Sequence, residues 1–249
     1  MPKWHPALWV LPLAGVVAAG LWVMRPNQPQ RTEPSHLGTS ATPAAMSKTS
    51  SSDAPALQWQ TVIQQLSRLA HCEQDHSCPP DSKTDPYAAD YARNQQIKAL
   101  LGQLTKTASQ LAAHLELHRV AVEYLNWPDG HVQSASLTLL SALPTEHDNV
   151  PIITQALQQS FDAPLMRQAL QELTRYPEQK KELQPFLSQV MQTGSFYAAQ
   201  EVAQGLLPFL TPDTVGSYQT LLSQLDPQST KAQMLAATLK EYQLRASGG

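Results

Sequence analysis

The stretch "APLMRQALQELTRY" at residues 163–176 decides the fold, because its pattern recurs along the chain. Its apolar residues Leu165, Ala169, Leu173 and Tyr176 lie three or four positions apart, as on one face of an α-helix. Leucine recurs at 33-residue intervals at Leu140, Leu173, Leu206 and Leu239. We therefore expect a helix with this face in every unit of about 33 residues.

Neighbouring positions keep the same register. They form the columns Leu137, Leu170, Ala203 and Ala236; Leu143, Tyr176, Phe209 and Tyr242; and Ser136, Ala169, Val202 and Leu235. Asp129, Asp162 and Ser195 precede the helices, where an N-cap side chain accepts a hydrogen bond from the first turn. A second helix in each unit has the apolar faces Leu117, Val120 and Tyr124; Val150, Ile153 and Leu157; Leu183, Phe186 and Val190; and Val215, Tyr218 and Leu222. The sequence predicts an all-α fold of two-helix repeats.

Two-helix units of this length resemble HEAT-like repeats, which are modules of α-solenoids. The resemblance covers about residues 117–244 and rests on the size of the unit and its apolar pattern. It implies a short stack of helix pairs, because one pair cannot bury its apolar face alone. Lys231 stands where Ala198 and Leu165 stand in earlier units, which predicts that the final helix is a C-terminal cap.

The N-terminus has a different character. Residues 6–24 are apolar and uncharged, about the length that crosses a bilayer core of roughly 30 Å. The segment ends in "LWVMRP" without a small-x-small cleavage site, so we expect a permanent transmembrane anchor in residues 1–24. Residues 25–55 are rich in Pro, Ser and Thr and predict a flexible linker. Residues 56–249 are then the all-helical repeat domain.

Orientation does not follow from charge, because Lys3 precedes the apolar segment and Arg25 and Arg31 follow it. The tail before this segment is short, and the two cysteines suit an oxidising compartment. We expect a bacterial inner-membrane protein with a cytoplasmic N-terminus and a periplasmic domain.

Charge and motifs bear on the class of function. The formal net charge is −3 and no Lys/Arg cluster is present, which argues against nucleic acid as a partner. The chain has no G-x-S-x-G or H-E-x-x-H sequence and no glycine-rich phosphate loop. We therefore expect no enzyme activity, no cofactor and no small-molecule substrate.

The stretch "HCEQDHSC" at residues 71–78 contains both cysteines. We favour a disulfide between Cys72 and Cys78, with a metal site and free thiols as alternatives. His114 and His118 stand four positions apart in "AAHLELH", but Leu115 replaces the glutamate of a metalloprotease motif.

We expect a scaffold that binds another protein of the cell envelope, in an assembly of the secretion, pilus or division type. The candidate contact residues are Gln155, Gln158, Gln159, Gln189, Gln219 and Trp127. For Trp127, and for Tyr197 and Met191, burial in the core is the simpler expectation.

The alternative is a steric folding chaperone for a secreted enzyme. The layout of anchor, linker and helical body is similar to that of bacterial lipase foldases, and "LLSALPTE" at 139–146 resembles part of their signature. The R-x-x-F-D-Y part of that signature is missing. A metal-binding enzyme that uses the histidines is the third hypothesis.

Overall fold

The computed structural model describes residues 54–75, 77–78, 86–110 and 112–248, which all belong to one compact unit, Thr49–Gly249. These residues form α-helices and short 3₁₀ helices and contain no β-strand. The helices are α1 (Ala54–His71), α2 (Pro86–Thr107), η2 (Ala108–Gln110), α3 (His114–Leu125), α4 (Gly130–Ser141), α5 (Asn149–Leu157), α6 (Ala163–Leu173), η3 (Pro177–Gln179), α7 (Lys180–Thr193), α8 (Phe196–Gly205), η4 (Leu207–Phe209), α9 (Pro212–Gln224) and α10 (Thr230–Ser247). The all-α prediction is confirmed.

The predicted transmembrane segment, residues 6–24, lies outside the described residues, and so does the predicted linker up to residue 53. Helix α1 begins at Ala54, within the stretch expected to be linker. None of the helices in the described part of the chain is long and apolar enough to span a membrane.

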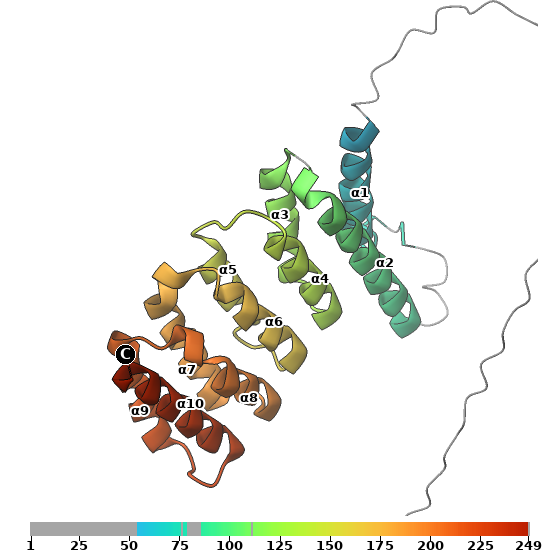
Figure 1. Ribbon diagram of the computed structural model, residues 1–249. Helices are drawn as coiled ribbons and strands as arrows, with labels where there is room; N and C mark the ends of the chain where they lie inside the picture. The colour runs from blue at the N-terminus through green and yellow to red at the C-terminus, as the bar shows by residue number, and fades with distance from the viewer. Residues whose placement is uncertain (1–53, 76, 79–85, 111, 249) are drawn as a thin grey trace, which may run out of the picture. The chain divides into compact units, whose positions relative to one another are not determined.

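The helices form two layers (Figure 1). Successive helices pair along the chain, from α1 with α2 to α9 with α10. The even-numbered helices pack side by side in chain order as one layer, and α3, α5, α7 and α9 form a second, less closely packed layer. Tyr124 of α3 links this second layer to α1, because its hydroxyl donates to the carbonyl of Leu66 at 2.8 Å.

Side chains cap four of the even-numbered helices at their first turn. Asp129 accepts from two backbone N–H groups of α4, Asp162 accepts from Leu165 N, and Ser195 accepts from Ala198 N. These three predicted caps are confirmed. The fourth cap is Ser229, because α10 begins 34 rather than 33 residues after α8.

The core consists of the predicted apolar columns. In the even-numbered helices and the turns after them, every column residue is buried except Ala236, which is exposed, and Tyr242, which is half-buried. In the odd-numbered helices the half-buried exceptions are Val215 and Leu222. All four exceptions lie in α9 and α10, the last helix pair, where no further described helix covers them.

Hydrogen bonds join positions about one unit apart within the even-numbered layer. The Gln168 side chain of α6 donates to the Ser134 carbonyl of α4 at 3.0 Å and accepts from the Ser134 hydroxyl at 2.6 Å. The Thr238 hydroxyl of α10 donates to the Ala203 carbonyl of α8 at 2.8 Å. Polar bonds therefore fix how neighbouring helices sit against one another, in addition to apolar packing.

Candidate protein-binding surface

A disulfide closes the segment after α1. Cys72 and Cys78 are bonded, with their Cα atoms 4.6 Å apart, and the backbone N–H of Ser77 donates to the Cys72 carbonyl at 2.9 Å. The predicted disulfide is confirmed. His76 lies outside the described residues, and His71 Nδ1 lies 2.9 Å from the Ser67 carbonyl of its own helix. No three His, Cys, Asp or Glu side chains of the described ranges gather where they could hold a metal ion.

Trp127 connects this segment to the helical stack. Arg93 of α2 pairs with Glu73 beside the disulfide, and its guanidinium carbon lies 5.8 Å from the centre of the Trp127 ring. The indole N–H donates to Asn94 Oδ1 at 2.9 Å, and the ring is half-buried. Trp127 therefore packs between α2 and the end of α3, as the burial expectation had it.

The two histidines of "AAHLELH" have separate surroundings. His118 Nε2 donates to Asn149 Oδ1 at 2.6 Å, and 12% of its side chain is exposed. His114 Nδ1 is buried without a hydrogen-bond partner. No described contact joins the two rings.

His118 begins a chain of polar groups that crosses three helices. Asn149 donates to the Tyr176 hydroxyl at 2.8 Å, which donates to Glu172 Oε1 at 3.0 Å. Arg175 binds both carboxylate oxygens of Glu172, whose side chain is only 1% exposed. Burial raises the pKa of Tyr176 to about 12. These bonds tie α3, α5 and α6 together in one arrangement.

Arg175 extends this network to the turn after α4. Its guanidinium donates to the carbonyls of Ser141 and Leu143, each at 2.9 Å. Both residues belong to "LLSALPTE", in which Leu139, Leu140 and Leu143 are buried. Core packing and a fixed turn thus account for much of the stretch that resembles the foldase signature.

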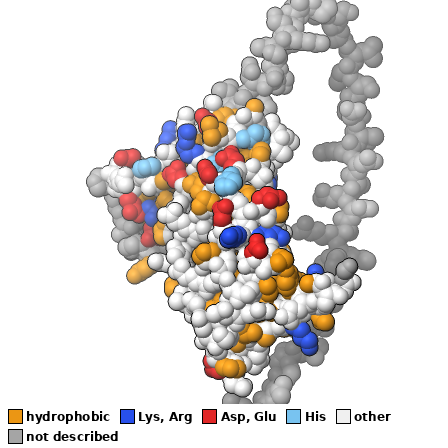
Figure 2. All heavy atoms as spheres, turned by 90° about the vertical axis from the view of Figure 1, so that its left-hand side faces the viewer, with side chains coloured by type: hydrophobic (Ala, Val, Ile, Leu, Met, Phe, Trp, Pro, Cys, Tyr) orange, Lys and Arg blue, Asp and Glu red, His pale blue; other side chains and the backbone are white. Residues whose placement is uncertain are grey.

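The five candidate glutamines are exposed on or beside α5, α7 and α9. The structure brings two of them together, because Gln158 Nε2 donates to Gln189 Oε1 at 2.8 Å. Gln192 of α7 reaches Gln224 of α9 at 3.4 Å in the same way. Figure 2 shows a face on which charged and histidine side chains gather in the upper part, while uncharged polar groups and backbone cover much of the lower part. The surface of the odd-numbered layer is therefore able to form neutral polar contacts.

Three aromatic side chains form an exposed cluster that we call the aromatic edge: Phe161, Phe196 and Tyr197. Their exposed fractions are 72%, 54% and 68%. Phe161 precedes α6, whereas Phe196 and Tyr197 begin α8, and the Ser195 hydroxyl joins the two segments by donating to the Phe161 carbonyl at 3.1 Å. The Phe196 and Tyr197 rings meet edge to face at 5.3 Å.

The expectation of burial is wrong for Tyr197 and correct for Met191, which is fully buried. The sequence analysis missed Phe161 and Phe196. Their signal was their place directly beside the capping residues Asp162 and Ser195, where a helix begins at the rim of a stack.

A shallow groove of about 330 Å³ separates α6 from α8 beside this edge. Its two charges satisfy each other, because Arg167 Nε donates to Glu201 Oε2 at 2.8 Å. The groove therefore presents no free charge to a ligand.

Comparison with known proteins gives no match to this chain among protein-family models, curated proteins or solved structures.

Proposed function

We propose that the protein is a non-catalytic scaffold that binds another protein of the cell envelope on a HEAT-like α-solenoid. The observation that carries the proposal is the aromatic edge. Three large aromatic side chains stay in contact with solvent although the rest of the described unit buries its apolar columns. Exposed apolar patches often mark interaction sites, and aromatic side chains contribute much of the binding energy there.

Three features support the solenoid architecture. The starts of α4, α6, α8 and α10 lie 33 or 34 residues apart, and each carries a side-chain cap. Equivalent positions share burial, and hydrogen bonds link residues about one unit apart. Stacks of such units present extended surfaces, which suit protein partners better than small ligands.

The remaining parts of the proposal concern location. The apolar segment at residues 6–24 would hold the protein in the bacterial inner membrane, with residues 25–53 as a tether. The disulfide between Cys72 and Cys78 supports an oxidising compartment such as the periplasm. The partner would then be a component of a secretion, pilus or division assembly, held by apolar and neutral polar contacts.

The test is crosslinking of the full-length protein in its native envelope, followed by purification and mass spectrometry. Phe161→Ala, Phe196→Ala and Tyr197→Ala are combined in one variant. We expect its partner yield to fall at least tenfold, because an aromatic hot spot contributes about 2 kcal/mol. Leu244→Ala is the matched control, since this side chain on α10 is 63% exposed but lies outside the aromatic edge.

A fixed set of envelope proteins, lost in the triple variant and kept in the control, would support the scaffold. A single secreted enzyme that leaves once it has folded would favour the steric chaperone instead. Unchanged capture by the triple variant would overturn the role of the aromatic edge.

A further inference from the structure

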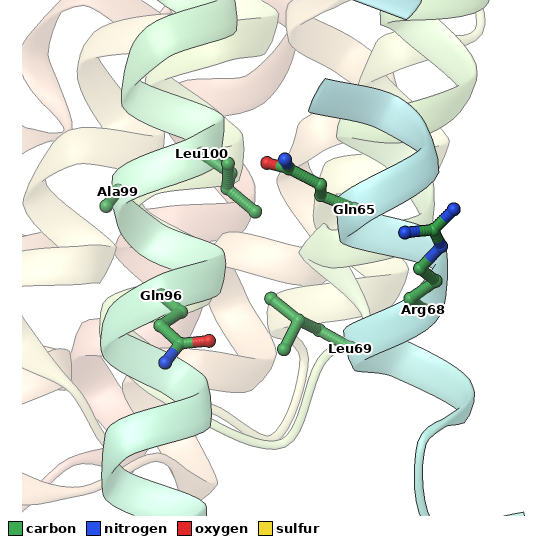
Figure 3. A pocket seen from close by; sticks show the side chains of 6 residues that line it. All are labelled: Gln65, Arg68, Leu69, Gln96, Ala99 and Leu100. Atoms are coloured by element: carbon green, nitrogen blue, oxygen red, sulfur yellow. The ribbon is translucent and has the colours of Figure 1, made fainter. Parts of the chain in front are cut away.

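A second open surface lies between α1 and α2, the first helix pair (Figure 3). The groove has a volume of about 370 Å³ and is lined by Gln65, Arg68, Leu69, Gln96, Ala99 and Leu100. Leu69 points from α1 toward α2, and Leu100 points from α2 toward α1. Both leucines are half-buried and pack against the core, so they give the groove an apolar floor.

The shape of the groove suits a helix. The lining residues of α1 are 65, 68 and 69, and those of α2 are 96, 99 and 100, which is the same i, i+3, i+4 spacing on both walls. Ridges at this spacing receive the side chains of a third helix packed along them. The chain already uses this mode of packing, because α4 packs against both α2 and α3. Within the described residues the groove between α1 and α2 remains open.

Arg68 gives the groove its charge. Arg93, Arg167, Arg175 and Arg245 each pair with a carboxylate. Arg68 is exposed and pairs with no carboxylate of the described residues, and no acidic side chain lines the groove. A ligand that brings a carboxylate to this rim would gain an ion pair that no neighbouring acid competes for.

We propose that the groove binds an amphipathic helix of another protein, with small and branched apolar residues on one face and Asp or Glu along its flank. A second copy of this chain is the poorer fit. Two grooves face to face would bring two Arg68 side chains together. An end-to-end stack would set Arg68 near α10, whose exposed cations Lys240 and Arg245 outnumber its one acidic residue, Glu241. The inference rests on the proposed function only in that both describe an interaction module.

The test uses the full-length protein in the cells that make it. The photo-crosslinking amino acid p-benzoylphenylalanine replaces Ala99 in the groove or, as a control, the adjacent exposed Lys98, which does not line it. We expect an adduct with one other protein from position 99 and none from position 98. The crosslinked peptide should carry apolar residues at i, i+3 or i+4 with acidic residues beside them.

A charge reversal tests the role of Arg68. Arg68→Glu should lower the yield of the adduct at least fivefold. Arg119→Glu should leave it unchanged, because Arg119 on α3 is also exposed and without a described carboxylate partner but lies outside the groove. Equal yields in the two variants would overturn the acidic flank.

The same crosslinker at Tyr197 separates this inference from the proposed function. An adduct at 197 without one at 99 overturns the groove and leaves the scaffold standing. An adduct at 99 with lipid, or with a second copy of the chain, also overturns the helix of another protein. The absence of adducts at both positions overturns both proposals.

Discussion

Three buried tyrosines allow the polar interior to be tested by one kind of substitution. The Tyr176 hydroxyl accepts from Asn149 and donates to Glu172. The Tyr124 hydroxyl makes one bond, to a backbone carbonyl of α1. The Tyr218 hydroxyl is buried without a hydrogen-bond partner. Replacement of each by phenylalanine keeps the ring in the core and removes only the hydroxyl.

The expected losses of stability differ in a fixed order. A neutral hydrogen bond contributes about 1 kcal/mol net, and one to a charged group about 1.5–3 kcal/mol. Tyr176→Phe removes one bond of each kind, so the free energy of unfolding should fall by about 3 kcal/mol. Tyr124→Phe should cost about 1 kcal/mol. Tyr218→Phe should cost nothing or stabilise slightly, because it removes a buried polar group that has no partner.

Urea unfolding, followed by far-UV circular dichroism, measures all three changes. The slope with denaturant should stay the same, since the surface exposed on unfolding hardly changes. Suppose that Tyr218→Phe lowered stability as much as Tyr176→Phe did. Ring packing rather than the hydroxyl network would then carry the effect, and the reasoning would be refuted.

Three further predictions concern the ends of helices and high pH. Reduction of the Cys72–Cys78 bond should cost about 2 kcal/mol, seen as a lower urea midpoint with dithiothreitol, and the oxidised protein should be two hydrogens lighter. Asp162→Ala should cost about 1 kcal/mol. Asp148→Ala, which removes a side chain that makes no cap bond, should leave the urea midpoint unchanged, and equal shifts would contradict the cap. The pKa of Tyr176 is raised from 10.0 to about 12, so its contribution to stability is complete below pH 10 and lost as the pH rises toward 12. Tyr176→Phe should therefore show a smaller loss of stability in urea titrations across this pH range.

The features that could be predicted from sequence are local and periodic. A capping side chain bonds within its own first turn, so Asp129, Asp162 and Ser195 could be identified by position alone. Burial at every third or fourth residue likewise depends on one helix at a time. The fixed interval failed at Ser229, because the turn before α10 is one residue longer.

The features that could not be predicted depend on contacts between units. Glu172 is a charged residue in a helix, and periodicity places such residues at the surface. It is buried because Arg175 and Tyr176 satisfy its carboxylate while Asn149, from the preceding helix, completes the network. The aromatic edge has the converse origin, since aromatic side chains ordinarily pack in cores. At the start of α6 and of α8 the positions beside the cap face outward, whatever residue occupies them.

The buried polar network and the two proposed binding surfaces belong to one argument. Burial of a paired carboxylate is seldom more stabilising than apolar packing of the same volume, but it can favour one arrangement of the elements around it. The network around Glu172 fixes α3, α5 and α6, which lie between the first helix pair and the aromatic edge at α6 and α8. A scaffold that holds one partner at the groove between α1 and α2 and another at Phe161 and Tyr197 needs those surfaces at a constant separation. We therefore infer that the interior polar groups contribute to the function by keeping the middle of the stack rigid.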